Sequence, residues 1–430
     1  MGLKGAGYKI IKSPPWRKRR VLAVGAERDA ERLWVRTDKT VAAVMLAGMC
    51  TFLNVYPTQP LLPYFRHLFH ASELEVSFTV SATVFAVALV APFVGVMAER
   101  HGRKRVIVPS LLFLSLATTL CGSARSLEGL IGWRFLQGVF VPGVIAVMLA
   151  YIVEEWEGRG VGRAMAAYVS GGVMGGFLGR FLSGLITTHW NWRAAFVALG
   201  AFNLLGALAV GAWLPPATRF VSAEHMGHAL AEARRHLQNP RLLANFGMGA
   251  AILFGLVGCF TYTSFYLAAP PFHLNAAQLG SIFFVYLVGV VVTPISGKFL
   301  DHYGFRPTAY LYCGMTVAGL LLTLVRSLPA VIAGLAVFSS GVFIAQAAAT
   351  VNTGAIAGRA RSSAAGLYVT FYYLGGSLGA IVTGWFWEWA QWRGCVAVLG
   401  AMEVVSLGLA LLSSRPGEQL PSEEAEIGGD

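Results

Sequence analysis

The chain has 430 residues, of which 56% are hydrophobic and 13% charged, and its mean hydropathy is +0.62. That apolar content is too high for one or two soluble domains and indicates a membrane protein. The net charge of +12 could suggest nucleic-acid binding. However, the basic residues are scattered between apolar runs and form no single face, so we expect no nucleic-acid partner. The five cysteines show no metal-ligand spacing, and we expect no metal site.

Apolar and polar segments divide the chain into five predicted regions. A basic tail covers 1–39, a polar linker covers 215–242, and a short acidic tail covers 414–430. Ser222 suits the N-cap of an amphipathic helix in the linker. Two groups of six apolar runs, in 40–214 and 243–413, are long enough to cross a bilayer, at roughly 41–63, 76–97, 106–125, 130–153, 164–187, 194–214, 243–268, 278–298, 308–326, 330–356, 364–387 and 395–413. The sequence therefore predicts an all-α membrane protein with twelve transmembrane helices.

The distribution of Lys and Arg predicts the orientation in the membrane. If the N-terminus is inside, the inside segments contain 26 of these residues, the outside loops contain 5, and 2 lie within spans. Cytoplasmic loops carry the basic excess in membrane proteins. We therefore expect both termini in the cytoplasm.

Two motifs recur at nearly the same distance along the chain. After the second span, Gly95, Glu99, Gly102 and Lys104 match Gly297, Asp301, Gly304 and Arg306 at an offset of 202. In spans five and eleven, Gly175, Gly176, Gly179 and Gly184 match Gly375, Gly376, Gly379 and Gly384 at an offset of 200. Because six is an even number of spans, both copies enter the membrane in the same direction. The pattern predicts two parallel six-helix repeats.

The first motif has a physical logic of its own. Gly95 and Gly297 would let helices approach closely, and Gly102 and Gly304 would permit tight turns. Glu99 could form a charge network with its basic neighbours that holds one side of the protein closed in one state and breaks in the other. The alternative is a basic anchor that only sets topology. The candidate gate residues are Gly95, Glu99, Arg100, Gly102, Arg103, Lys104, Arg105, Gly297, Asp301, Gly304 and Arg306.

Twelve spans in two halves, a polar linker and the loop pattern G-x-x-x-D/E-R-x-G-R-K-R together resemble the major facilitator superfamily. The resemblance implies a transporter that works by alternating access, and no enzyme activity. Glu99 stands where aspartate is usual. The segments 56–63 and 269–273 are similar to the bacterial YnfM-like inner-membrane branch, which resembles drug:proton antiporters. This second similarity implies export driven by the proton motive force, with no bound cofactor.

Three charged residues inside spans are candidates for coupling. Arg134 and Gln137 match the R-x-x-Q-G motif that the resemblance associates with proton transfer, but Arg134 is shallow enough to extend to the headgroups instead. Arg180 has Ala380 as its counterpart, so the scaffold common to both halves does not require its charge; it could face an anion or pack between helices. Glu403 could carry a proton or be a neutral structural residue. The first span contains no Asp or Glu, so proton coupling rests on resemblance alone.

Neutral polar and aromatic residues are the remaining candidates for a substrate cavity. Aromatic residues near span ends more often lie at the membrane interface, and those within spans more often pack between helices, so both alternatives stay open for each residue. They are Asn54, Tyr56, Gln59, Tyr262, Tyr266, Gln346, Asn352, Tyr368 and Tyr372. As a set they describe an amphipathic cavity that suits a neutral or weakly charged solute.

The function predicted from the sequence is secondary transport of a small molecule, with export by proton antiport as the first expectation. An uptake symporter or a uniporter of the same fold is the nearest alternative, and a membrane receptor or membrane-embedded enzyme is a more distant one. We expect a monomer in the cell inner membrane whose partners are its substrate, protons and lipid.

Overall fold

The computed structural model describes residues 38–156, 160–217, 234–358 and 361–414, which are nearly all helical and include no strand. The predicted basic tail, linker helix and acidic tail lie almost wholly outside these residues. The first described helix covers 38–55. The elements that follow are η1 Gln59–Leu61, α2 Leu62–Phe69, α3 Glu73–His101, α4 Arg103–Cys121, α5 Leu127–Phe140, α6 Pro142–Glu155, α7 Val161–His189, α8 Trp192–Trp213, α10 Pro240–Ala268, α11 Ala276–Ile282, η2 Phe283–Leu287, α12 Val288–Tyr303, α13 Phe305–Leu322, α14 Leu328–Ala357 and α15 Arg361–Ser413.

The helices account for the twelve predicted spans. Within the described residues, ten helical segments are long and apolar enough to cross a membrane. The last of them holds two helices, because Ala390 and Gln391 have non-helical backbone angles within α15. The ninth predicted span is α13, which is not among the ten; its first turns contain Arg306 and Pro307, which lower its hydropathy. Its 18 residues still extend about 27 Å, close to the thickness of a bilayer core.

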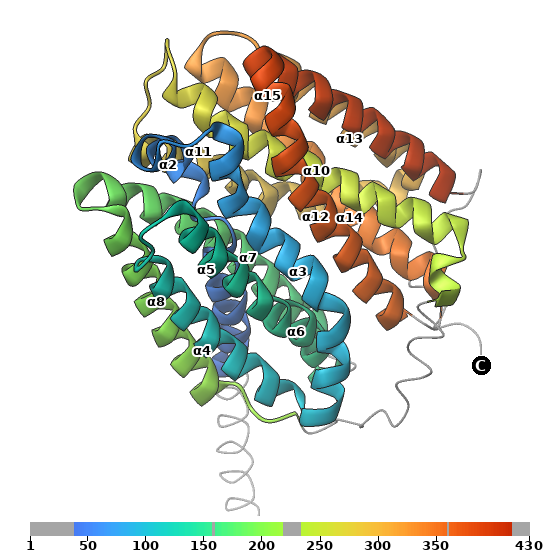
Figure 1. Ribbon diagram of the computed structural model, residues 1–430. Helices are drawn as coiled ribbons and strands as arrows, with labels where there is room; N and C mark the ends of the chain where they lie inside the picture. Colours follow the sequence, from blue (N-terminus) through green and yellow to red (C-terminus); the bar gives the residue numbers. More distant parts are fainter. Residues whose placement is uncertain (1–37, 157–159, 218–233, 359–360, 415–430) are drawn as a thin grey trace, which may run out of the picture.

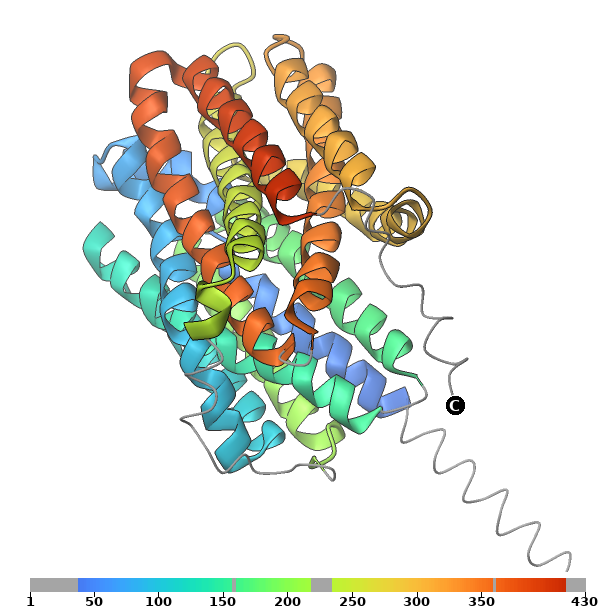
Figure 2. The same cartoon turned by 90° about the vertical axis from the view of Figure 1, so that its right-hand side faces the viewer.

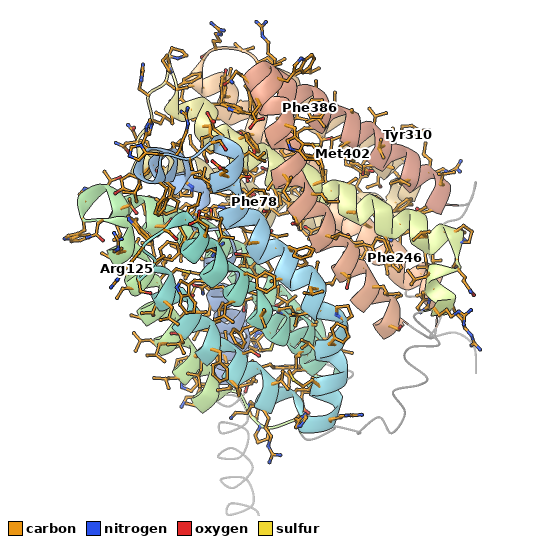
Figure 3. The ribbon with its side chains drawn as sticks, viewed as in Figure 1. Phe78, Arg125, Phe246, Tyr310, Phe386 and Met402 are labelled. Carbon is orange, nitrogen blue, oxygen red and sulfur yellow. The ribbon has the colours of Figure 1, made fainter. Side chains whose placement is uncertain are left out.

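The helices form two bundles that stand side by side (Figure 1) and remain so after a quarter turn (Figure 2). The first bundle ends with α8, and the second begins with α10. Large apolar side chains cover the outside of both bundles, as lipid contact requires. Phe93 is 70% exposed and Leu205 is 68% exposed. Tyr310 projects from α13 on the outer surface of the second bundle (Figure 3).

The sequence repeat corresponds to a repeated helix contact. Two glycines of each half lie at matching positions so close to the backbone of a neighbouring helix that an added Cβ would be at most 2.3 Å from a carbonyl oxygen. The contacts pair Gly175 with Met49, Gly179 with Leu53, Gly375 with Ala250 and Gly379 with Phe254. The fifth span therefore packs on the first as the eleventh packs on the seventh, through small residues that let backbones touch.

The two bundles contact each other toward one end. We call the end that contains Gly102 and Gly304 the loop-motif end, and the other the opposite end. Between the bundles, α3 packs against α15 and α7 against α11. Hydrogen bonds toward the opposite end join the bundles, among them Ser77 Oγ to the Ala380 oxygen at 3.4 Å, Ser377 Oγ to the Ser81 oxygen at 3.2 Å, and the Ala277 amide to Thr188 Oγ1 at 3.0 Å.

Candidate functional site

The loop motif forms the same turn in each half. Gly102 separates α3 from α4 and has φ +88°, and Gly304 separates α12 from α13 and has φ +81°. Residues with side chains rarely adopt this left-handed region, so glycine is required at both positions. At Gly297, in contrast, an added Cβ would meet no described atom within 4 Å. The close helix approach expected at this glycine is therefore absent on the side where a side chain would lie, whereas the neighbouring Ser296 and Leu300 are buried.

The charge network at the first loop motif is built around Arg103. Its Nε lies 3.1 Å from Glu154 Oε2 and its Nη2 lies 2.6 Å from Glu154 Oε1, a two-point ion pair. Arg103 is buried, and Glu154 lies in the last turn of α6. This geometry is the stronger form of an arginine–carboxylate contact. Sequence reasoning missed Glu154, because only the packing of α6 against α4 brings it to the motif.

The other motif residues are placed less centrally. The surroundings of Gly95 and of the Glu99 side chain lie outside the described positions, so the predicted role of Glu99 stays a prediction. Arg306 donates from Nε to Ser414 Oγ at 3.0 Å. Lys104 is half-buried, and three residues are exposed: Arg100, Arg105 and Asp301.

Arg134 is fully buried and forms a clamp inside the first bundle. Its Nε donates to the Thr79 carbonyl oxygen at 2.9 Å, and its Nη1 donates to the Asn54 carbonyl oxygen at 2.7 Å. Nη2 donates to the Val55 carbonyl oxygen, and Nη1 also donates to Gln137 Oε1. The alternative in which this arginine extends to the headgroups is wrong, because its exposed fraction is 0%.

The carbonyl groups of Asn54 and Val55 are available because the first helix is broken by proline. The helix ends at Val55, and Pro57 and Pro60 lack the amide hydrogens that would continue it. The last carbonyl groups of a helix need other donors. Arg134 supplies them, so it stabilises the helix end as well as linking three helices.

A chain of neutral side chains extends the Arg134 clamp. Gln137 Nε2 donates to Thr118 Oγ1 at 2.7 Å, and Thr118 Oγ1 donates to Asn54 Oδ1 at 2.8 Å. Asn54 Nδ2 donates to Asn203 Oδ1 at 3.1 Å. Asn54 is therefore a buried interhelical residue in this structure, with its side chain occupied by protein partners.

Arg180 lies where the two bundles meet. Its Nε donates to Gln59 Oε1 at 2.7 Å, and its Nη1 donates to the Gly176 carbonyl oxygen at 2.6 Å. Gln59 Nε2 in turn donates across the interface to Thr261 Oγ1 at 3.2 Å. The guanidinium carbon is 4.6–4.7 Å from the ring centroids of three aromatic residues, Tyr56, Phe283 and Tyr286. We call Arg180, Gln59 and these three rings the Arg180 cluster.

The charge of Arg180 has no carboxylate partner among the described residues. The exposed fraction of Arg180 is 2%, and no ion pair among the described residues includes it. Burying an unpaired cation costs several kcal/mol, and each desolvated cation–π contact returns only about 2 kcal/mol. The sequence pointed to Arg180 and Gln59, but it did not show that Phe283 and Tyr286 of η2 would complete the cluster.

Glu403 is buried in the second bundle, apart from the interface. Its exposed fraction is 1%, and its Oε1 has no hydrogen-bond partner within the described ranges. An added Cβ at Gly255 would lie 2.5 Å from Oε1. In the repeat, Glu403 takes the place of Asn203, whose partner Asn54 bonds to it; Gly255 has no side chain to offer. Glu403 beside Gly255 therefore occupies, in the second bundle, the place that the Asn203–Asn54 pair occupies in the first.

The structure groups some of the predicted cavity residues and separates others. Tyr368 donates from its hydroxyl to Gln346 Oε1 at 3.0 Å and stacks on Tyr372 with 5.9 Å between centroids. Gln346 and Tyr372 are half-buried. In contrast, Tyr262 is fully buried with its hydroxyl on the Ala380 carbonyl oxygen.

Two further cavity candidates lie in helix contacts. Tyr266 stacks on Trp392 at 5.1 Å, near the opposite end. Asn352 Nδ2 donates to Asn245 Oδ1 at 2.9 Å and to Ser413 Oγ at 3.0 Å. These two residues contribute to packing in this structure, because each side chain is engaged by its own bundle.

Two similar bundles of membrane-spanning helices, with functional groups at their interface, define the class of multi-pass membrane transporters. The sequence model of the Major Facilitator Superfamily matches residues 44–377 and 252–428. The inner membrane transport protein YnfM of Escherichia coli is 33% identical over 370 residues, which covers 86% of this chain and 89% of that protein. The uncharacterized MFS-type transporter YybF of Bacillus subtilis is 30% identical over 391 residues, covering 91% and 96%. The chain belongs to the Major Facilitator Superfamily.

Solved structures share the fold at low sequence identity. The nucleoside transporter NupG, in a mutant form, has a TM-score of 0.72 at 13% identity and covers 87% of this chain and 100% of its own. A bacterial homolog of the human lysosomal transporter Spinster, inward-facing and occupied, has a TM-score of 0.70 at 15% identity, covering 89% and 96%. The family assignment confirms the predicted fold and the prediction that the chain is a transporter and no enzyme.

Proposed function

We propose that this transporter exports a small organic solute by alternating access, driven by protons that enter in exchange. The observation that carries alternating access is the one-sided contact between the bundles, and the resemblance of the sequence to drug:proton antiporters supports export in exchange for protons. The hydrogen bonds of Ser77, Ser377 and Thr188 join the bundles toward the opposite end. Rocking two rigid bundles about a site between them requires contacts of this kind to break as the other side closes.

The proposed orientation places the loop-motif end in the cytoplasm. The support is the excess of Lys and Arg, with 26 in the segments on that side and 5 in the loops on the other. Closure at the opposite end then corresponds to an inward-facing state. The similarity to YnfM of Escherichia coli supports an inner-membrane location, and we propose that the protein works as a monomer.

The proposed gate is the loop motif of the first bundle. Its support is the two-point ion pair between Arg103 and Glu154, which joins α4 to α6 at the loop-motif end. We propose that the pair, together with Glu99, has different partners in the outward-facing state. Such an exchange of charged contacts is a common way to make two states distinct.

The proposed proton carriers are Glu403 and the group around Arg134 and Gln137. Glu403 is supported by its burial and by the absence of a partner for Oε1 among the described residues. Arg134 is supported by its motif, although carbonyl oxygens and Gln137 already occupy its donors. A carboxyl group that changes its protonation is the simpler carrier.

The direct test uses proteoliposomes with an imposed pH gradient and a panel of labelled solutes. For the exporter, we expect the solute and the protons to cross the membrane in opposite directions. Movement of solute and protons together would establish a symporter, and movement indifferent to the gradient would establish a uniporter. Failure of every solute to move, with the protein shown to be folded, would contradict transport by this chain.

A further inference from the structure

The Arg180 cluster leaves one part of the guanidinium unused. Nε and Nη1 are hydrogen-bonded, but Nη2 makes no hydrogen bond to a described residue. The rings of Tyr56, Phe283 and Tyr286 lie around the guanidinium, and none of these residues provides an anion. The cluster therefore fixes a cation in a defined position without neutralising it.

The scaffold does not need this cation. The repeat places Ala380 at the corresponding position of the eleventh span, where it packs with an exposed fraction of 0%. The same glycine contacts flank both positions, so alanine is sufficient for packing. A buried charge that the fold can do without is expected to serve binding or transport.

Gln59, the side-chain hydrogen-bond partner of Arg180 in this structure, is uncharged and can be displaced by a stronger acceptor. Gln59 offers a neutral amide oxygen to Nε and uses its amide nitrogen to hold Thr261 of the other bundle. A carboxylate accepts two parallel hydrogen bonds from a guanidinium, and such charge-assisted bonds are about twice as strong as neutral ones. An anion that reached Arg180 would therefore displace Gln59 and remove a bond between the bundles.

Half-buried polar side chains lie on the loop-motif side of the Arg180 cluster. Tyr372 and Gln346 are both half-buried, and Tyr372 precedes the bundle contact at Ser377 in α15. Tyrosine rings and an amide suit the uncharged body of an amphipathic solute. The charged end of such a solute would meet Arg180, and its body would lie toward the tyrosines.

From this geometry we infer that the transported solute is a small organic carboxylate, which Arg180 recognises at the bundle interface and which releases the Gln59–Thr261 bridge when it binds. The inference rests on the proposed transport function and specifies its substrate class. It replaces the neutral or weakly charged solute that the sequence suggested. Arg180 is the specificity-determining residue, and Gln59 competes with the solute for it.

The experiment compares carboxylates with their amides in binding to the purified full-length protein in lipid nanodiscs. The probes are benzoate and 3-phenylpropanoate with benzamide and 3-phenylpropanamide, and the readout is the midpoint of thermal unfolding as a function of probe concentration. At least one carboxylate should raise the midpoint, and its amide should not. Arg180→Gln should weaken that response at least ~tenfold, as expected for loss of a hydrogen bond between charged groups.

Two further variants keep the test decisive if Arg180→Gln does not fold. Gln59→Leu removes the competing amide and should strengthen the carboxylate response, whereas a purely structural role of Arg180 predicts no gain. Arg66→Gln removes an exposed cation that pairs with Glu73 at 3.3 Å and should leave the response unchanged.

Equal responses to carboxylates and amides, no response to any carboxylate, or an unchanged response in Arg180→Gln would each overturn the inference. Binding is measured without a membrane gradient, so its failure says nothing against transport. Binding that stays intact while proteoliposomes move no solute would instead contradict the proposed transport function.

Discussion

Replacing Arg134 with lysine separates the two roles that this residue can have. The arginine makes four hydrogen bonds with three nitrogens, to the carbonyl oxygens of Thr79, Asn54 and Val55 and to the Gln137 side chain. Lysine keeps the positive charge but has a single nitrogen, which can reach at most two of these acceptors.

The expected cost follows from the bonds that are lost. At least two hydrogen bonds from a charged group disappear in Arg134→Lys, and each contributes about 1.5–3 kcal/mol. The free energy of unfolding should therefore fall by about 3–6 kcal/mol, because the broken end of the first helix loses its donors. The assay is unfolding of the purified protein in mild detergent, followed by circular dichroism, with proton flux measured in proteoliposomes.

Arg193→Lys is the matched control. Arg193 is exposed and donates one hydrogen bond, to the Ala124 carbonyl oxygen at 3.1 Å, so its replacement should change stability by less than ~1 kcal/mol. If Arg134→Lys unfolds like the wild type but no longer couples protons to solute, the clamp explanation is refuted. Arg134 would then act in proton transfer, as its motif suggests.

Three other predictions concern packing, the gate and coupling. Gly179→Ala should destabilise the protein by about 1–3 kcal/mol, because the added Cβ would lie 2.1 Å from a backbone oxygen of the first helix. Gly132→Ala is the control, because an added Cβ there would have no described atom within 4 Å and should not change stability. Equal melting temperatures of the two variants would contradict the tight contact at Gly179. Arg103→Ala and Glu154→Ala should slow transport to a similar degree, and the double variant should be no slower; additive losses would show that they act separately. Glu403→Gln should abolish proton flux while solute still exchanges along its own gradient, and unchanged proton flux would exclude this glutamate as the carrier.

The sequence by itself determined the class of the protein, because long apolar runs and repeated small-residue motifs have local causes. A run of about 20 apolar residues can only span or be buried, and glycines such as Gly102 mark turns that other residues cannot make. The match between Gly175 and Gly375 likewise predicted the repeat, since close helix contacts need small residues wherever they occur.

Only the tertiary structure decided which polar groups meet. Arg134 and Arg180 are both arginines inside spans, yet one is saturated by carbonyl groups at a broken helix end, and the other has a nitrogen with no hydrogen-bond partner among the described residues. The difference arises from residues far away along the chain, including Pro57, Phe283 and Thr261. Side-chain partners across helices depend on how the helices pack, which no local pattern encodes. This packing turned Arg180 from a candidate into a proposed anion site.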